Sequence, residues 1–383
     1  MSVKSQTLIL YLCTILVLCT LYAAQPIQPL FKSEFSLNSF QAAIFTTVIM
    51  LPLGIAPILY GYILENFSAK QMLSGSMLFL GILEAIFSLS SSYPLLIGIR
   101  AVQGFLIPAA LTSLISYIST SATVSTVQKA LGNYVAVTII GGFLGRFLSG
   151  VSAGAFGWRP FFLLIGICLI GLSLLLMKVK ADAKPAFSKP ALSHALKVVK
   201  IRHNTFLYCG IFAVFFVFQG LLNFLPFELK TLSGSFSEGK VGFMYAGYIM
   251  GVITAFNISK IVKFIGSETK SLIIGALIYL AGLQLFNFPS FKVMFCSMFV
   301  FCLGMFMVHT IAAGLVNKLA KEYKSITNGL YLSSYYAGGT FGTFIPGYFF
   351  QHYGWHVFLA FLSLALFVGL VFWILLYREI GNS

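Results

Sequence analysis

Four ionisable side chains lie inside long apolar stretches of the chain, namely Glu84, Arg100, Arg146 and His309. A charge at the centre of a bilayer costs about 2.5 to 3.5 kcal/mol on insertion scales, so such groups face a cavity or a partner. A guanidinium can bind an anionic group of a substrate, a carboxylate can carry a proton, and an imidazole exchanges protons at physiological pH. These residues are therefore candidates for a substrate and proton pathway.

Each of the four also has a structural interpretation. Arg100 can donate hydrogen bonds to backbone carbonyls, Arg146 can belong to a local structural pair, and Glu84 can form a scaffold ion pair instead of carrying protons. His309 can equally be a hydrogen-bonded packing residue. We favour the pathway for the two arginines and the ion pair for Glu84, and both interpretations of His309 stay open.

Uncharged polar side chains near these groups recur at helical spacing. Most of them either share the helical face of an arginine or precede a proline that loosens the helix. The set comprises Gln103, three residues after Arg100; Tyr22, Gln25 and Gln28, bounded by Pro26 and Pro29; Gln219 and Asn223, before Pro226; and Tyr335. We expect these residues to line the pathway. Hydrogen bonding between helices is the alternative.

The composition excludes a water-soluble protein. Hydrophobic residues make up 59% of the chain and charged residues 9%, with a mean hydropathy of +0.95. A soluble globule needs roughly a quarter of its residues charged. The six cysteines have neither metal-ligand nor disulfide spacing, and the single aspartate, Asp182, excludes the acidic clusters typical of polytopic membrane enzymes. We therefore predict an all-α integral membrane protein without metal or cofactor, and not an enzyme.

Apolar stretches of about 20 residues, long enough to cross the hydrocarbon as helices, predict twelve transmembrane spans. They fall near residues 8–30, 41–64, 71–90, 93–118, 130–155, 160–177, 205–228, 240–262, 271–288, 291–317, 328–351 and 356–377.

The distribution of basic residues predicts the orientation of these spans. Arg100 and Arg146 lie within spans, and Lys32, Arg159, Lys230, Lys240 and Lys292 fall on the side opposite the N-terminus. The rest of the 24 Lys and Arg residues fall on the N-terminal side. Cytoplasmic loops carry such an excess, so both termini are expected in the cytoplasm, with the protein in the cytoplasmic (inner) membrane. The net charge of +15 then needs no nucleic-acid partner.

An internal repeat divides the chain into two halves. The glycine-rich segment 141–150 recurs as 338–347, and Gly157-Trp158 recurs as Gly354-Trp355 at the same offset of 197 residues. We expect an N-terminal six-helix bundle over residues 1–177, a cytoplasmic linker over 178–204 and a C-terminal six-helix bundle over 205–383. An even number of spans in each half makes the two copies parallel and pseudo-symmetric.

Parallel six-span halves are the arrangement of the major facilitator superfamily, in which the substrate binds near the midplane between the halves. The motifs of the chain resemble this family. Gly61–Lys70 is similar to its loop between the second and third spans, with Glu65 in place of Asp. Arg100-Ala101-Val102-Gln103-Gly104 matches its Arg-x-x-Gln-Gly motif. The resemblance implies a transporter of this fold.

The glycine-rich fifth span resembles the antiporter motif of efflux members, although Gly145-Arg146 replaces the family's Gly-Pro. Together with segments 22–26 and 335–339, it makes the chain most similar to the YnfM-type and arabinose-efflux-like bacterial permeases, which are related to drug:proton antiporters. Gating and helix packing are expected from a set of charged loop residues and small residues: Glu65, Lys70, Gly141, Gly142, Gly145, Gly150, Gly338, Gly339, Gly342 and Gly347.

The leading hypothesis is a monomeric secondary active transporter that expels a small molecule by alternating access, driven by protons. A uniporter or importer of a small metabolite is the alternative within transport, and a polytopic membrane enzyme is the alternative outside it. The sequence does not name the cargo. Its arginines weakly favour a substrate with an anionic group.

Overall fold

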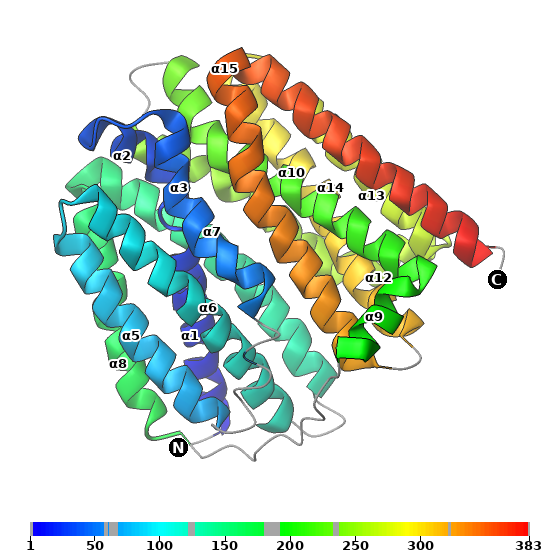
Figure 1. Cartoon of the computed structure of the whole chain (residues 1–383), viewed down its shortest axis with the longest axis horizontal. Helices are drawn as coiled ribbons and strands as arrows, with labels where there is room; N and C mark the ends of the chain where they lie inside the picture. The colour runs from blue at the N-terminus through cyan, green and yellow to red at the C-terminus, as the bar shows by residue number, and fades with distance from the viewer. Residues whose placement is uncertain are drawn as a thin grey trace. The chain divides into compact units, whose positions relative to one another are not determined.

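The computed structural model describes residues 3–56, 60, 68–121, 127–179, 192–232, 237–320 and 323–381, and within them every regular element is an α-helix or a short 3-10 helix. The chain divides into two compact units (Figure 1). Unit 1 contains Met1–Leu37, Ile44–Lys189 and Phe236–Phe243, and unit 2 contains Asn38–Ala43, Pro190–Ser235 and Met244–Ser383.

The first span of unit 1 is interrupted. It comprises α1 (Val3–Tyr22), the 3-10 helix η1 (Gln25–Ile27) and α2 (Gln28–Glu34). Pro26 lacks the N–H that would continue the hydrogen-bond ladder of α1, which explains the interruption. The described helices that follow are α3 (Ser39–Met50), which belongs to unit 2 up to Ala43, η2 (Leu51–Gly54), α5 (Ala69–Leu89), α6 (Tyr93–Ser121), α7 (Val127–Phe156) and α8 (Arg159–Leu176).

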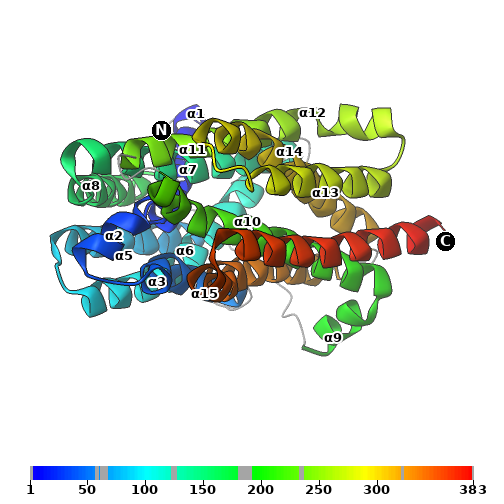
Figure 2. The ribbon, with the colours of Figure 1, turned by 90° about the horizontal axis from the view of Figure 1, so that it is seen from above.

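Unit 2 begins with α9 (Leu192–Lys200), a short helix that Figure 2 shows beside the other helices of the unit and not among them. The long helices follow: α10 (Arg202–Leu232), α11 (Glu238–Met244) with η3 (Tyr245–Tyr248) and α12 (Ile249–Ile265), then α13 (Glu268–Leu285), α14 (Phe291–Leu319) and α15 (Lys324–Gly381). By its contacts, most of α11 belongs to unit 1.

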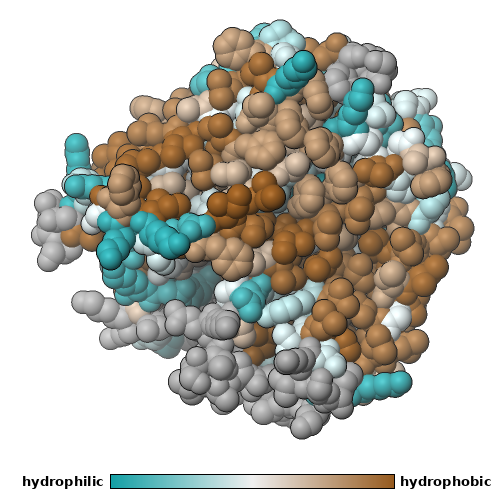
Figure 3. Space-filling model, turned by 180° about the vertical axis from the view of Figure 1, so that it is seen from behind, coloured by the Kyte–Doolittle hydropathy of each residue, from teal (hydrophilic) through white to brown (hydrophobic). Residues whose placement is uncertain are grey.

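The helices confirm the predicted membrane architecture. Ten helical stretches among the described residues are long and apolar enough to cross a membrane, and the stretch Ser39–Gly54 is a shorter apolar helix. One of the ten, Ile326–Ile380, contains two spans joined at Gly354, so each of the twelve predicted spans has a helical counterpart. Large apolar side chains such as Phe256 and Phe264 are exposed, and most of the face in Figure 3 is hydrophobic. These surfaces suit contact with lipid.

The repeat seen in the sequence recurs in the backbone. Gly157, between α7 and α8, has φ of 83°, and Gly354, within α15, has φ of 79°. Both values lie in the left-handed region that favours glycine. The chain therefore turns in the same way before the last helix of each half.

Small residues allow backbones to touch in both units. A Cβ added at Gly145 would lie 2.6 Å from Cα of Cys19 in α1, and one at Gly141 would lie 3.0 Å from Cα of Ile15. In unit 2, the equivalents Gly338 and Gly342 lie against the carbonyls of Phe212 and Phe216 in α10. These close contacts make α7 and α1 neighbours, and likewise α15 and α10.

The other predicted packing glycines have varied surroundings. Gly150 lies against Gly242 within unit 1, and Gly142 lies beside Arg146 and the ring of Tyr22. Gly347 lies against Phe224 and Phe40 within unit 2, and Gly339 is buried in α15.

Replacing Gly145 by alanine is expected to lower the free energy of unfolding by about 1 to 3 kcal/mol, because the new methyl group must push α7 away from the backbone of α1. Gly171→Ala is the matched control, since a Cβ there meets no atom within 4 Å. Thermal unfolding of both variants in detergent measures the difference. Equal unfolding temperatures for the two variants would contradict the close contact.

Candidate functional site

Arg146 on α7 lies at the centre of a buried polar cluster in unit 1. Its Nε donates to Oε1 of Gln25 at 2.6 Å, and its Nη1 donates to the carbonyl of Gly142 at 2.8 Å. The guanidinium lies over the ring of Tyr22, 3.8 Å from the ring centre. The structure thus brings together three of the predicted pathway residues, Tyr22, Gln25 and Arg146, which we call the Arg146 cluster.

The local backbone explains how the Arg146 cluster forms. Gly145 brings α7 against Cys19, only three residues before Tyr22, so the next side chain of α7 reaches the interruption of the first span. Gly142 carries no side chain, which leaves its carbonyl open to the guanidinium one turn later. An arginine over an aromatic face with one amide partner can hold an anionic or aromatic ligand group.

Gln28, the third member of the predicted stripe, contacts a different helix. Its Nε2 donates to Oγ1 of Thr46 in α3 at 2.6 Å, and the side chain is fully buried. Between Gln25 and Gln28 the backbone leaves helical geometry at Ile27, where φ is −103° and ψ is 9°. The regular spacing in the sequence therefore does not become one continuous face.

Arg100 on α6 is fully buried and bonded mainly to backbone. Its Nη1 donates to the carbonyl of Thr20 at 2.9 Å and its Nη2 to that of Leu21 at 3.3 Å, while Nε donates to the carbonyl of Phe45 in α3 at 3.2 Å. Nη1 also donates to Oε1 of Gln103 at 3.1 Å. Arg100 thereby joins α6 to α1 and α3.

Two of these acceptors belong to the end of α1. The last four carbonyls of any helix have no partner within the helix, and those of Thr20 and Leu21 are among them. Glu84 on α5 lies 3.9 Å from Nη1 of Arg100, and both side chains are fully buried. The contacts support the structural interpretation of both residues: Arg100 satisfies the broken end of α1, and Glu84 balances its charge.

His309 and three aromatic residues form a second cluster, in unit 2. Nδ1 of His309 on α14 lies 3.5 Å from the hydroxyl of Tyr331, which donates to the carbonyl of His309 at 3.3 Å. The ring of Tyr335 lies 4.6 Å from the imidazole and stacks on Phe215 of α10 at 3.6 Å, centre to centre. His309 and Tyr335 are half-buried. This His309 cluster contains two predicted pathway residues, His309 and Tyr335.

The polar pair on α10 is more buried than His309 and Tyr335. Gln219 and Asn223 are fully buried, and Nδ2 of Asn223 donates to the carbonyl of Thr343 in α15 at 3.0 Å. This bond is of the interhelical kind. It supports the packing alternative for Asn223.

Two charged loop residues, Glu65 and Lys70, are predicted to act in gating. Lys70 lies at the N-terminal end of α5. Its Nζ donates to the carbonyls of Met177 and Val179, at 2.9 and 2.6 Å, just beyond the end of α8. A cation suits the C-terminus of a helix. Glu65, with most of its loop, lies outside the described residues.

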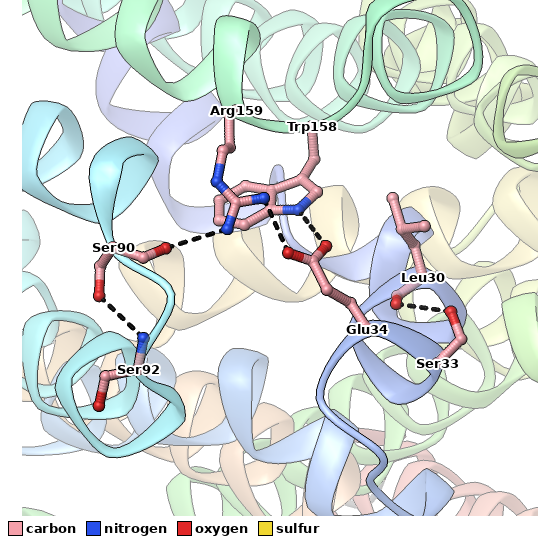
Figure 4. Close-up of polar contacts among 7 residues, drawn as sticks. All are labelled: Leu30, Ser33, Glu34, Ser90, Ser92, Trp158 and Arg159. Atoms are coloured by element: carbon pink, nitrogen blue, oxygen red, sulfur yellow. Dashed lines mark hydrogen bonds and ion pairs between the residues drawn. The ribbon is translucent and has the colours of Figure 1, made fainter.

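One polar cluster, which we call the polar corner, was not predicted from the sequence (Figure 4). Oε2 of Glu34 accepts from Nε1 of Trp158 at 2.7 Å, and Oε1 pairs with Nη1 of Arg159 at 2.7 Å. Arg159 also donates to the carbonyl of Ser90 at 3.2 Å. The corner joins the ends of α2 and α5 to the start of α8.

The repeat provides the signal that would have found this corner. In unit 2, Trp355 donates to the carbonyl of Phe286 at 2.9 Å, and Nδ1 of His356 lies 3.0 Å from Oδ1 of Asn287. Trp355, His356 and Asn287 lie 197 residues after Trp158, Arg159 and Ser90. The repeated Gly-Trp pair therefore anchors the last helix of each half.

In the part of the chain that the structure describes, no three His, Cys, Asp or Glu side chains lie close enough together to hold a metal ion.

Comparison with known proteins identifies the chain's relatives. The family model described as Major Facilitator Superfamily matches residues 10–324. The Escherichia coli (strain K12) protein named "Inner membrane transport protein YnfM" is 24% identical over 380 residues, covering 98% of this chain and 91% of that protein. An "Uncharacterized transporter" of Buchnera aphidicola subsp. Schizaphis graminum is 25% identical over 345 residues, covering 88% and 82%.

Solved structures share the fold. A mutant form of the nucleoside transporter NupG superposes with a TM-score of 0.80 at 12% identity, covering 97% of this chain and 99% of its own. A bacterial homolog of the human lysosomal transporter Spinster, inward-facing and occupied, gives 0.80 at 15% identity, covering 98% and 97%.

Proposed function

The chain belongs to the major facilitator superfamily, and from this premise we propose that it expels a small molecule across the cytoplasmic membrane as a proton-coupled secondary transporter working by alternating access. It is a multi-pass membrane transporter and not an enzyme, in keeping with the relatives and solved structures above, all of which are transporters.

The observation that carries the proposal is the Arg146 cluster. Its guanidinium lies at the interruption of the first span, in contact with Tyr22 and Gln25, on a helix whose glycine-rich segment resembles the antiporter motif. A cargo with an anionic or polarised group could bind there by displacing the amide of Gln25. We therefore assign substrate binding in unit 1 to Tyr22, Gln25 and Arg146.

Proton coupling is assigned to the His309 cluster. The imidazole of His309 lies within reach of the Tyr331 hydroxyl and against the Tyr335 ring, and it is half-buried. An imidazole is the side chain suited to gain and lose a proton near neutral pH. Glu84 is the less suitable carrier because Arg100 pairs with it in the buried core.

The topology follows from the distribution of basic residues. We place both termini and the linker, residues 178–204, in the cytoplasm, between an N-terminal bundle over 1–177 and a C-terminal bundle over 205–383. The transporter is proposed to act as a monomer. Cysteine labelling of the linker in intact cells, which should fail unless the membrane is permeabilised, tests this orientation.

Coupling is tested in inverted membrane vesicles. Thermal-shift screening of the purified protein against metabolites and drugs first supplies a cargo. Collapse of the imposed pH gradient is expected to reduce uptake of that cargo by at least about ten-fold, which corresponds to 1.4 kcal/mol. His309→Gln should lose this dependence while still binding the cargo. Uptake that is indifferent to the gradient would instead identify a uniporter.

A further inference from the structure

The short helix α9 has an exposed apolar side next to a basic side. Leu196 and Val199, three residues apart, are 59% and 41% exposed. Lys197 and Lys200, also three residues apart, are exposed on the adjacent face. Residues at this spacing lie next to each other on a helix, so each pair forms a stripe.

A third face of α9 fixes the orientation of these stripes. Val198 is buried, and the ring of His194 stacks on Tyr323 with the ring centres 4.5 Å apart. The first turn of α10 holds the other end, because Asn204 donates to the carbonyl of Val198 at 3.2 Å and Thr205 to that of Val199 at 2.5 Å. The apolar stripe therefore points away from the rest of unit 2.

The position of α9 in the chain places it at the edge of the bilayer. It ends at Lys200, and the membrane-spanning α10 begins at Arg202. Ile201, between them, is 43% exposed and adds to the apolar surface. With one residue between α9 and a span, the helix is within reach of the lipid headgroups.

We propose that α9 lies in the interface of the bilayer, with Leu196 and Val199 at the acyl boundary and Lys197 and Lys200 on anionic phospholipid headgroups. Interfacial helices combine these features, and lysines extend along the apolar surface to place their ammonium groups among phosphates. The two lysines carry the charge complementarity, since Arg202 has an acidic neighbour, Glu379, at 4.0 Å. The inference concerns a surface remote from the cargo and does not depend on it.

The test uses the full chain in lipid nanodiscs, with the exposed cysteines Cys168 and Cys296 replaced by serine. An environment-sensitive fluorophore is attached in turn at Leu196→Cys, Val199→Cys and Lys197→Cys. In discs of phosphatidylglycerol and phosphatidylcholine, the labels at 196 and 199 should emit at shorter wavelength and be quenched by a nitroxide-bearing lipid. The label at 197 should stay open to aqueous iodide.

The charge requirement is tested by Lys197→Gln with Lys200→Gln, read out by the label at position 196. This pair should abolish the difference between discs with and without phosphatidylglycerol. The matched control, Lys230→Gln with Lys292→Gln, removes the same charge at the other end of the spans and should keep the difference. All variants must keep the parental unfolding temperature in detergent, a check that matters most for Lys230, which is half-buried, whereas Lys197, Lys200 and Lys292 are exposed.

Three outcomes would overturn the proposal. Iodide quenching of the label at 196 in anionic discs would show that water covers the stripe. Shielding of that label in detergent, without quenching by the nitroxide lipid, would show that other residues of the chain cover it. Shielding only in discs loaded with two copies would identify a second copy as the occupant.

Discussion

Replacing Arg146 by alanine is expected to reduce transport of the cargo to background, a loss of at least about ten-fold, while the protein still inserts and folds. The side chain is fully buried, and it holds Gln25 by a 2.6 Å bond and Tyr22 through its ring. Alanine removes the charge that would attract the cargo and releases both partners at the interruption of the first span. Uptake in inverted vesicles and the amount of protein in the membrane fraction measure the two parts of this prediction.

The control is Arg202→Ala, which removes the same type of charge from a side chain that is 77% exposed. It should leave transport within about two-fold of the parent, as expected for surface substitutions. Gln25→Ala should fall between the two arginine variants, because it removes one bond and leaves the cation. Full transport by Arg146→Ala would remove the Arg146 cluster from the binding site.

The largest effect on stability is expected from Arg100→Gln, which should lower the free energy of unfolding by about 3 to 5 kcal/mol. The substitution removes both an ion pair and a set of hydrogen bonds to backbone carbonyls. The carboxylate of Glu84 is left buried without its cation, and the carbonyls of Thr20, Leu21 and Phe45 lose their donors. Unfolding in detergent by heat or by a denaturing surfactant measures the change.

A double-mutant cycle with Glu84→Gln separates these two causes. If the ion pair matters, the double variant should be more stable than Arg100→Gln by at least about 1 kcal/mol, because it buries no unpaired charge. Full additivity of the two substitutions would contradict a coupling between Arg100 and Glu84. The residual loss in the double variant then measures the contribution of the backbone hydrogen bonds.

The membrane architecture could be predicted from the sequence because it follows from averages over about 20 residues. Apolar stretches, the 197-residue repeat and the glycines at 157 and 354 all recur in the helices, and the left-handed turns at those glycines repeat as well. The end of the second span stays a prediction. Its predicted range, 41–64, extends past the described helix Ser39–Gly54 into residues of which only some are described.

The site was predicted less completely, for physical reasons. The sequence indicates Tyr22, Gln25 and Arg146 as separate candidates. Only the folded backbone, with its close contact at Gly145, brings the three side chains together. The acceptors of Arg100 are carbonyls, which every residue carries, so no side-chain pattern indicates them. Gln28 contacts α3 and not α7 because the backbone leaves helical geometry at Ile27, and sequence periodicity assumes a uniform helix.

The bonds from Arg100 to Thr20, Leu21 and Phe45 have a mechanical consequence. Donor and acceptors lie on α6, α1 and α3, so none of these segments can shift against the others without stripping a buried guanidinium of its hydrogen bonds. During a transport cycle they should travel as one rigid piece. Spin labels on α1 and α6 should therefore keep a constant separation under every condition that moves the cargo.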